Sequence, residues 1–361
     1  MNELAELTVE LVSIPSHEDE TAAGDRIESW LRSETNAAVA RDETGNVIAR
    51  RSGTGEPQRS LALVGHHDVV PPAPEQLDGE RYVVETRDGR IYGRGSADMK
   101  GAVAASMLAF RDAAIAPDVE LVFASFVGEE IGGTGARAAI EAGFAPDCAI
   151  VAEGSTNYSK LGVTDVVVAH RGRRASTLVA RGSAAHASEP EAGTNAIYRA
   201  CDAVDIVRDL SVPTAEVFGT QVEGSVVVTK IDGGTAWNVV PDECTVTIDE
   251  RTVPGGYADL TRAAAIDGVE HVVEQDLPPM ACDDKEFAQL VLNAAVDVQD
   301  RSPEHVTKPH ATDAGWLVQA GVSCVVCGAS EPGEAHTKTE SAAIDVLDRC
   351  ERIYRTAAER F

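Results

Sequence analysis

Positive charge is scarce in this sequence. It has 31 lysine and arginine residues against 59 aspartate and glutamate residues, a formal net charge of −28, and only six of the positive residues are lysine. A surface this negative repels nucleic-acid phosphates and anionic membranes, so we exclude both as partners. The acidic residues are dispersed rather than gathered in a tail, which indicates a halophilic-type surface adapted to a cytoplasm rich in potassium salt.

Long hydrophobic runs are also missing. No stretch reaches the roughly 18 apolar residues that a membrane-spanning helix needs, and residues 1–10 lack the basic region of a signal peptide. The seven cysteines are scattered and odd in number, which is typical of a reducing compartment, so we expect a cytoplasmic location. Cys324 and Cys327 form a CxxC pair, but they lie in a β-branched run that predicts a buried strand, and we expect both to pack in the core.

The length of the chain predicts two domains, because 361 residues exceed what one hydrophobic core usually supports. Short apolar runs alternate with helical patterns in the first and last parts, and this predicts a mainly parallel sheet covered on both faces. The middle part changes to β-branched strands with two interleaved helices. We therefore predict an α/β domain of residues 1–165 and 276–361, interrupted by an α+β domain of residues 166–275.

The individual elements follow from the apolar spacing. In the first domain we expect helices at 3–13, 22–34, 102–113, 135–142, 286–298 and 342–360, and strands at 60–65, 120–127, 148–152 and 322–328. In the second domain we expect strands at 166–169, 175–181, 225–232 and 243–251, and helices at 195–209 and 256–265.

Side chains that bind metals follow the predicted strands of the first domain. They are His66 and Asp68 after strand 60–65, Glu129 and Glu130 after 120–127, Glu153 after 148–152, Asp98 in a glycine-rich loop that opens a helix, and His336 in the loop after 322–328. In open α/β sheets, ligands bind at the carboxyl ends of the strands. Histidine and carboxylate side chains at these places therefore indicate a metal site.

Two of these motifs allow a choice of chemistry. The glycines of residues 93–101 also suit a phosphate-binding loop, but the segment lacks the lysine ending of such loops and the dinucleotide spacing. Asp98 would repel phosphate, so a metal ligand fits better. The adjacent Glu129 and Glu130 can divide two roles, one carboxylate binding metal and the other accepting a proton from water.

Together, the segments GHHDVVP, GRGSADMKG, GEEIGG, VAEGS, WNVVPDE and the late AH resemble the zinc-dependent family of acetylornithine deacetylase, succinyl-diaminopimelate desuccinylase and aminoacylase. The likeness extends in order and spacing from about residue 8 to about residue 356. It implies a phosphorylase/hydrolase-like catalytic domain and a ferredoxin-like lid that also forms a homodimer. It further implies two zinc ions, for which cobalt can substitute. The implied ligands are His66, Asp98 and Glu153 for one ion, and Glu130, Asp98 and His336 for the other, with Asp98 bridging.

The resemblance also implies roles for residues that bind no metal. Glu129 is expected to be the general base, and Asp68 to orient the neighbouring histidine ligand. His186, in the segment GSAAHASEP, is expected to hydrogen-bond the tetrahedral oxyanion, in many relatives within the partner subunit's active site. Asn238 and Arg251 are expected to hold the substrate's carboxylate or carbonyl. The alternatives are a surface histidine for His186 and a surface ion pair for Arg251.

The expected substrate is a small N-acylated diamino acid, either N-succinyl-diaminopimelate or N-acetylornithine. Arg171, Arg173 and Arg174 of the lid could receive extra carboxylates, which slightly favours the succinyl compound, and acidic residues of the loop 330–340 could bind a second ammonium group.

Three alternatives remain open. One is a dipeptidase or carboxypeptidase of the same family. Another is a hydrolase that releases lysine or ornithine from an acidic carrier protein, which a net charge of −28 disfavours. The last is a non-catalytic metal-binding scaffold, and the presence of Glu129, which is not an expected ligand, argues against it.

Overall fold

The computed structural model describes residues 2–361, and the chain divides into two compact units. The first unit comprises Met1–Ala169, Ala281–Lys308 and Thr312–Phe361. The second comprises His170–Met280 together with Pro309–Ala311. Each unit has its own sheet, and each is described separately below.

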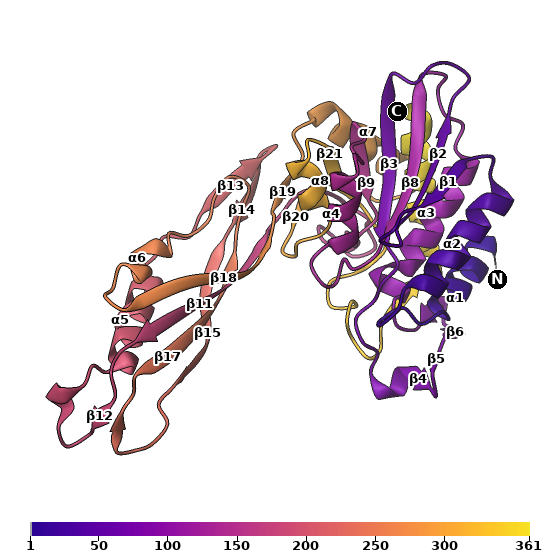
Figure 1. The fold of residues 1–361 in the computed structure, drawn as a ribbon. Helices are drawn as coiled ribbons and strands as arrows, with labels where there is room; N and C mark the ends of the chain where they lie inside the picture. Colours follow the sequence, from indigo (N-terminus) through magenta and orange to yellow (C-terminus); the bar gives the residue numbers. More distant parts are fainter. Residues whose placement is uncertain (1) are drawn as a thin grey trace. The chain divides into compact units, whose positions relative to one another are not determined.

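A nine-stranded sheet forms the centre of the first unit, in the order β1-β2-β8-β3-β9-β21-β10-β19 with β20 paired to β10 (Figure 1). The strands are β1 (Ala38–Arg41), β2 (Val47–Ser52), β3 (Arg59–His66), β8 (Val119–Phe126), β9 (Cys148–Val151), β10 (Val166–His170), β19 (Met280–Ala281), β20 (His305–Lys308) and β21 (Ser323–Val326). The four strands β8, β3, β9 and β21 run parallel, and their apolar runs are almost wholly buried. Such runs are typical of strands covered on both faces, and the mainly parallel central sheet is confirmed.

Some helices of this unit pack against the sheet and others against those helices, and the remaining short strands form two small sheets of their own. The helices are α1 (Glu3–Val12), α2 (Thr21–Glu34), α3 (Gly101–Asp112), α4 (Thr134–Glu141), α7 (Lys285–Val298), α8 (Ala314–Gln319) and α9 (Ile344–Arg360). These short strands are β4 (Leu77–Asp78) with β5 (Arg81–Tyr82), and β22 (Ser341–Ala343) with β7 (Arg90–Tyr92) and β6 (Glu85–Arg87). α3 contacts β3, β8 and α9, and its first ten residues are buried, which explains why this helix is rich in alanine.

The second unit has a four-stranded antiparallel sheet in the order β15-β17-β11-β18. Its elements are β11 (Arg173–Arg181), α5 (Ala196–Arg208), β15 (Ser225–Gly233), β17 (Glu243–Arg251), α6 (Thr261–Ala264) and β18 (Val269–Leu277). Leucine, valine and isoleucine of the strands pack against alanines of α5 and α6. This β-α-β-β-α-β arrangement confirms the ferredoxin-like prediction. Two short pairs complete the unit, β12 (Ala185–His186) with β16 (Val239–Val240), and β13 (Thr214–Val217) with β14 (Thr220–Glu223).

Two sequence predictions differ from the structure. The strand expected at 166–169 was assigned to the inserted domain, but β10 pairs with β21 through Val167 and Val326 and so belongs to the central sheet. Its five residues are all buried, as its uninterrupted apolar run requires. The helix expected at 256–265 forms only as α6, because Gly256 and Val253 exchange backbone hydrogen bonds in a turn that precedes it.

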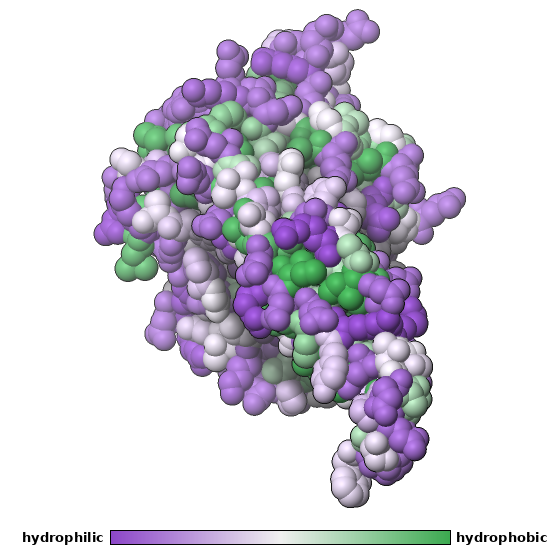
Figure 2. Space-filling view, turned by 90° about the vertical axis from the view of Figure 1, so that its left-hand side faces the viewer, coloured by the Kyte–Doolittle hydropathy of each residue, from purple (hydrophilic) through white to green (hydrophobic). Residues whose placement is uncertain are grey.

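Polar side chains cover most of the face in Figure 2, with hydrophobic residues in small groups between them. Cys324 and Cys327 are both buried with free thiols, which confirms their place in the core. Within residues 2–361, none of the helices combines the length and the hydrophobicity that crossing a bilayer would require.

Candidate metal centre

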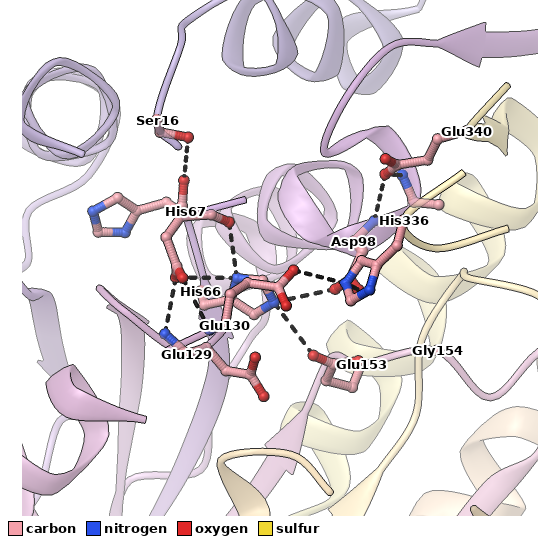
Figure 3. Close-up of polar contacts among 12 residues, drawn as sticks. Ser16, His66, His67, Asp98, Glu129, Glu130, Glu153, Gly154, His336 and Glu340 are labelled. Atoms are coloured by element: carbon pink, nitrogen blue, oxygen red, sulfur yellow. Dashed lines mark hydrogen bonds and ion pairs between the residues drawn. The ribbon is translucent and has the colours of Figure 1, made fainter. Parts of the chain in front are cut away.

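The parallel strands β3, β8 and β9 deliver acidic and histidine side chains to one edge of the central sheet (Figure 3). His66 is the last residue of β3, Glu129 and Glu130 follow β8, and Glu153 follows β9. The carboxyl ends of parallel strands meet at the same edge, so four side chains far apart in the sequence converge there. Asp98 joins them from the irregular turn Ser96–Lys100 that precedes α3.

His66 lies at the centre of the cluster and is 1% exposed. Its Nε2 is 3.1 Å from Asp98 Oδ1 and 3.3 Å from Glu153 Oε1. Its Nδ1 is 3.0 Å from the Asp68 carbonyl oxygen and 3.3 Å from Asp68 Oδ1. Donation from Nδ1 to Asp68 would leave Nε2 as the atom that ligates a cation held between it and the two carboxylates.

His336 approaches the same aspartate from the other side. Its Nε2 is 3.2 Å from Asp98 Oδ2 and 2.9 Å from Glu130 Oε1. Each oxygen of Asp98 therefore faces a different histidine, which is the arrangement that a carboxylate bridging two cations needs. His336 has a positive φ of 64° and a half-exposed ring, so this side of the cluster is open to solvent.

The donor atoms fit divalent cations. Two groups, His66 with Glu129 and Glu153, and His66 with Asp98 and Glu130, each bring their ligand atoms within 4.8 Å of one another. Burial disfavours the charged form of His66, yet the carboxylates of Asp68, Asp98 and Glu153 outweigh it and raise the pKa of His66. The carboxylates of the cluster thus concentrate negative charge, and this charge favours the binding of a cation. A mixed imidazole and carboxylate set suits zinc or cobalt.

Asp68 organises the turn that follows β8. Its Oδ1 and Oδ2 accept hydrogen bonds of 3.1 and 3.0 Å from the backbone N–H groups of Glu129 and Glu130. The turn itself depends on glycine, because Gly128 and Gly133 adopt φ values of 62° and 70° in the left-handed region. The carboxylate of Asp68 therefore holds both His66 and the two adjacent glutamates in place.

Glu129 and Glu130 point to different neighbours. Glu130 pairs with His336, whereas the carboxylate of Glu129 makes no hydrogen bond or ion pair within residues 2–361. Burial, together with the carboxylates of Asp313 and Glu153, raises the pKa of Glu129. The sequence-based division of roles between these two glutamates is thus compatible with their surroundings.

A buried ion pair supports the backbone of Asp98. Glu340 Oε1 accepts hydrogen bonds of 3.0 Å from the backbone N–H groups of Ala97 and Asp98, and its other oxygen pairs with Arg94. Neither Glu340 nor Arg94 has a side chain more than 4% exposed. The acidic residues of loop 330–340, which the sequence offers for a second ammonium group, already have cationic partners: Glu340 pairs with Arg94, and Glu331 and Glu334 pair with Arg90.

Replacing Glu340 by glutamine should lower the free energy of unfolding by about 3–5 kcal/mol, because it leaves the Arg94 guanidinium buried without a counter-charge. Chemical denaturation of the metal-free protein measures this loss. The matched control is Glu85→Gln, which breaks the exposed pair with Arg87 and should cost less than about 1 kcal/mol. Equal losses in the two variants would contradict the supporting role of Glu340.

The remaining predicted site residues lie in the second unit. His186 is exposed, with Nδ1 2.6 Å from Ser188 Oγ, and β12 and β16 pair it with Val239. Asn238 lies next to it, because its carbonyl oxygen accepts a 3.0 Å hydrogen bond from Ala187 N–H. The structure therefore brings His186 and Asn238 together in the lid.

The arginines expected to bind carboxylates are already paired. Arg251 Nε and Arg173 Nε each donate to Asp249 at 2.8 Å. Arg174 pairs with Asp276. The Arg251 ion pair that the sequence left open is thus present, and two of the three arginines that favoured a succinyl group, Arg173 and Arg174, already contact carboxylates of the second unit.

Sequence reasoning missed a cation beside the cluster. Lys308, at the end of β20, donates to Glu153 Oε2 at 3.1 Å and to the carbonyl oxygen of Gly154 at 3.0 Å. It is one of only six lysines in the chain, and it ends a short strand. These two features could have marked Lys308 as a functional residue, but neither identifies its partner Glu153, which lies 155 residues away in the sequence.

The fold and the cluster together define a hydrolase with a candidate metal centre. The profile of peptidase family M20/M25/M40 matches residues 62–360, and the chain belongs to this family. The resemblance inferred from the motifs is therefore confirmed.

Curated relatives span the chain almost completely. An acetylornithine deacetylase of Myxococcus xanthus is 28% identical over 341 residues, which cover 88% of this chain and 84% of that protein. A succinyl-diaminopimelate desuccinylase of Stenotrophomonas maltophilia is 27% identical over 379 residues, which cover 100% of this chain and 99% of that protein.

Solved structures share the fold. Aminopeptidase PepT from Bacillus cereus superposes with a TM-score of 0.79 at 20% identity, covering 99% of this chain and 97% of that chain. The Bacillus subtilis YXEP protein, described as a dinuclear metal-binding peptidase of the M20 family, has a TM-score of 0.71 at 17% identity, covering 99% and 97% of the two chains. At these identities the likeness establishes the architecture of both units.

Proposed function

We propose that this chain is a two-zinc amidohydrolase that removes an N-acyl group from a diamino acid, either N-succinyl-diaminopimelate or N-acetylornithine. The observation that carries the proposal is Asp98, whose two oxygens face two different histidines beside the unpaired carboxylate of Glu129. The curated relatives support the reaction, because relatives covered to 84% and 99% of their own length are named acetylornithine deacetylase and succinyl-diaminopimelate desuccinylase.

Each residue of the centre has a definite task in this proposal. His66, Asp98 and Glu153 hold one zinc ion, and Asp98, Glu130 and His336 hold the other. Zinc bound there polarises the scissile carbonyl and lowers the pKa of water. Glu129 accepts the proton of the attacking water and passes it to the departing amine, which needs a carboxylate close to the metals but not ligated.

The lid residues are proposed to bind the substrate. His186 donates a hydrogen bond to the oxyanion that develops in the transition state. Asn238 and Arg251 hold the substrate's carboxylate. Arg173 and Arg251 share the single carboxylate of Asp249, so this group of three side chains keeps a net positive charge. Such a group attracts an anion in a protein whose net charge is −28.

The decisive assay is release of free amine from the two N-acylated substrates by metal-stripped protein in molar KCl, with and without added zinc. We expect zinc-dependent turnover of one of them. Turnover of neither, with zinc bound and the fold intact, would overturn the deacylase assignment. Dipeptides should be assayed in parallel, because solved structures of the same fold include an aminopeptidase and a tripeptidase.

We also propose a homodimer formed through the lid. β15 lies at the edge of the lid sheet with Val227 and Ile231 each about half exposed. An exposed apolar edge strand is a ready pairing surface. Mixing an inactive His186→Ala chain with an inactive Glu130→Ala chain tests whether the dimer shares its active sites. Recovered activity supports the sharing of sites, whereas no recovery in a confirmed mixed dimer excludes it.

The acidic surface leads to a prediction about salt. The melting temperature should rise as KCl is raised from low concentration to molar concentration, because a Debye length of about 3 Å near 1 M screens repulsion among the acidic side chains. Differential scanning fluorimetry across a KCl series measures this. A melting temperature independent of KCl would count against a potassium-rich cytoplasm as the habitat.

A further inference from the structure

Lys308 places a buried positive charge against one candidate metal ligand. Its side chain is 8% exposed, and its ammonium donates to Glu153 Oε2 and to the carbonyl oxygen of Gly154. Both acceptors belong to the segment that follows β9. The lysine is therefore committed to this segment rather than free to meet a substrate.

The two oxygens of Glu153 consequently have different surroundings. Oε1 faces His66 Nε2 at 3.3 Å, on the side where the donor atoms converge. Oε2 is held by Lys308. A carboxylate held in this way can offer one oxygen to a cation but cannot turn to offer both.

The opposite side of the cluster has no such cation. Within residues 2–361, Glu130 pairs only with His336, and Asp98 only with the two histidines and with the backbone support from Glu340. Glu153 is paired with a lysine that is not a proposed ligand, whereas the cationic partner of Glu130 is His336, itself a proposed ligand. The two halves of the cluster are therefore electrostatically unequal.

We propose that Lys308 is a positioning residue that keeps Glu153 a one-oxygen ligand and weakens the binding of the metal ion on the Glu153 side. This inference rests on the proposed two-metal centre and adds an inequality between its two sites. The ammonium opposes the positive charge of the ion and shares the electron density of Glu153. The ion on the Glu153 side is thus the one that dissociates more readily and remains the stronger Lewis acid.

The test is Lys308→Met, measured by metal affinity rather than by turnover. In the metal-free variant the Glu153 carboxylate loses its counter-charge, so the melting temperature should fall. A divalent ion supplies the missing positive charge without repulsion from the ammonium. The weaker of the two zinc affinities, measured by competition with a chelator, should therefore tighten about tenfold. With cobalt, the visible absorption should weaken, because a two-oxygen Glu153 raises the coordination number.

The direction of the change separates this proposal from a purely structural role. If Lys308 merely holds the fold together, its loss should loosen zinc binding, and that result would overturn the proposal, as would an unchanged cobalt spectrum. Lys308→Arg keeps the charge and should retain both the affinity and the spectrum. Lys308→Gln removes the charge but keeps a hydrogen-bond donor. It replaces Lys308→Met in the zinc-affinity measurement if the methionine variant does not fold.

A matched control is Lys160→Met, which removes a lysine paired with Glu304 in an exposed ion pair. It changes the net charge by the same amount and should leave zinc affinity unaltered. Because these measurements use no substrate, a protein that hydrolyses neither proposed substrate can still confirm or refute the role of Lys308.

Discussion

Replacing Glu129 by glutamine should lower kcat about a thousandfold and leave the zinc content unchanged, because general acid–base catalysis contributes about 10²–10⁴-fold. Glutamine has nearly the same shape as glutamate but cannot accept the proton of water. The carboxylate of Glu129 has no partner within residues 2–361, so its removal breaks no interaction that holds the site together. Steady-state kinetics with metal analysis of the same preparation measures both quantities.

The neighbouring residue supplies the matched control. Glu130→Gln makes the same chemical change one position along the chain, but Glu130 pairs with His336 at 2.9 Å. This variant should lose zinc as well as activity. If Glu129→Gln lost zinc to the same extent, Glu129 would be a ligand and the proposed proton transfer would be wrong.

Replacing Asp98 by asparagine should reduce bound zinc from two ions per chain to about one or fewer, and lower kcat/KM by at least about a hundredfold. Each oxygen of Asp98 faces a different histidine, and an amide nitrogen in place of one oxygen cannot ligate a cation. Metal analysis after exhaustive dialysis gives the stoichiometry, and kinetics in excess zinc give the activity.

Asp313→Asn is the control for this prediction. Asp313 is a buried neighbour of the cluster that raises the pKa of Glu129 and is not a proposed ligand. The Asp313→Asn protein should keep both zinc ions. An Asp98→Asn protein that still holds two ions would refute the bridging arrangement.

The residues that gather at the edge of the central sheet could be predicted, because each of them lies next to a strand that is recognisable from its own short sequence. Each parallel strand is a short apolar run that stops at a glycine or at a histidine or acidic residue, as at His66 and Glu153. Parallel strands must end at a common edge, so side chains at their ends share a place once the strands are recognised. Roles such as that of Glu129 came from the family resemblance, and they remain proposals.

Contacts between distant loops could not be predicted in this way. Lys308 and Glu340 reach the cluster across 155 and 242 residues of sequence, and no periodicity relates them to their partners. β10 was misplaced for a related reason. Its valines resemble those of the lid strands, and only the absence of alternating polar residues marks it as a strand covered on both faces.

The place where the lid is inserted has an evolutionary consequence. The chain leaves the catalytic unit after β10 and returns through β19, and these are neighbours in the sheet, with Cys282 N–H donating to the carbonyl oxygen of Val168 at 2.8 Å. The two ends of the insertion are thus close enough to be joined by a short turn. We infer that an insertion of this kind can be gained, lost or exchanged in evolution without rebuilding the central sheet.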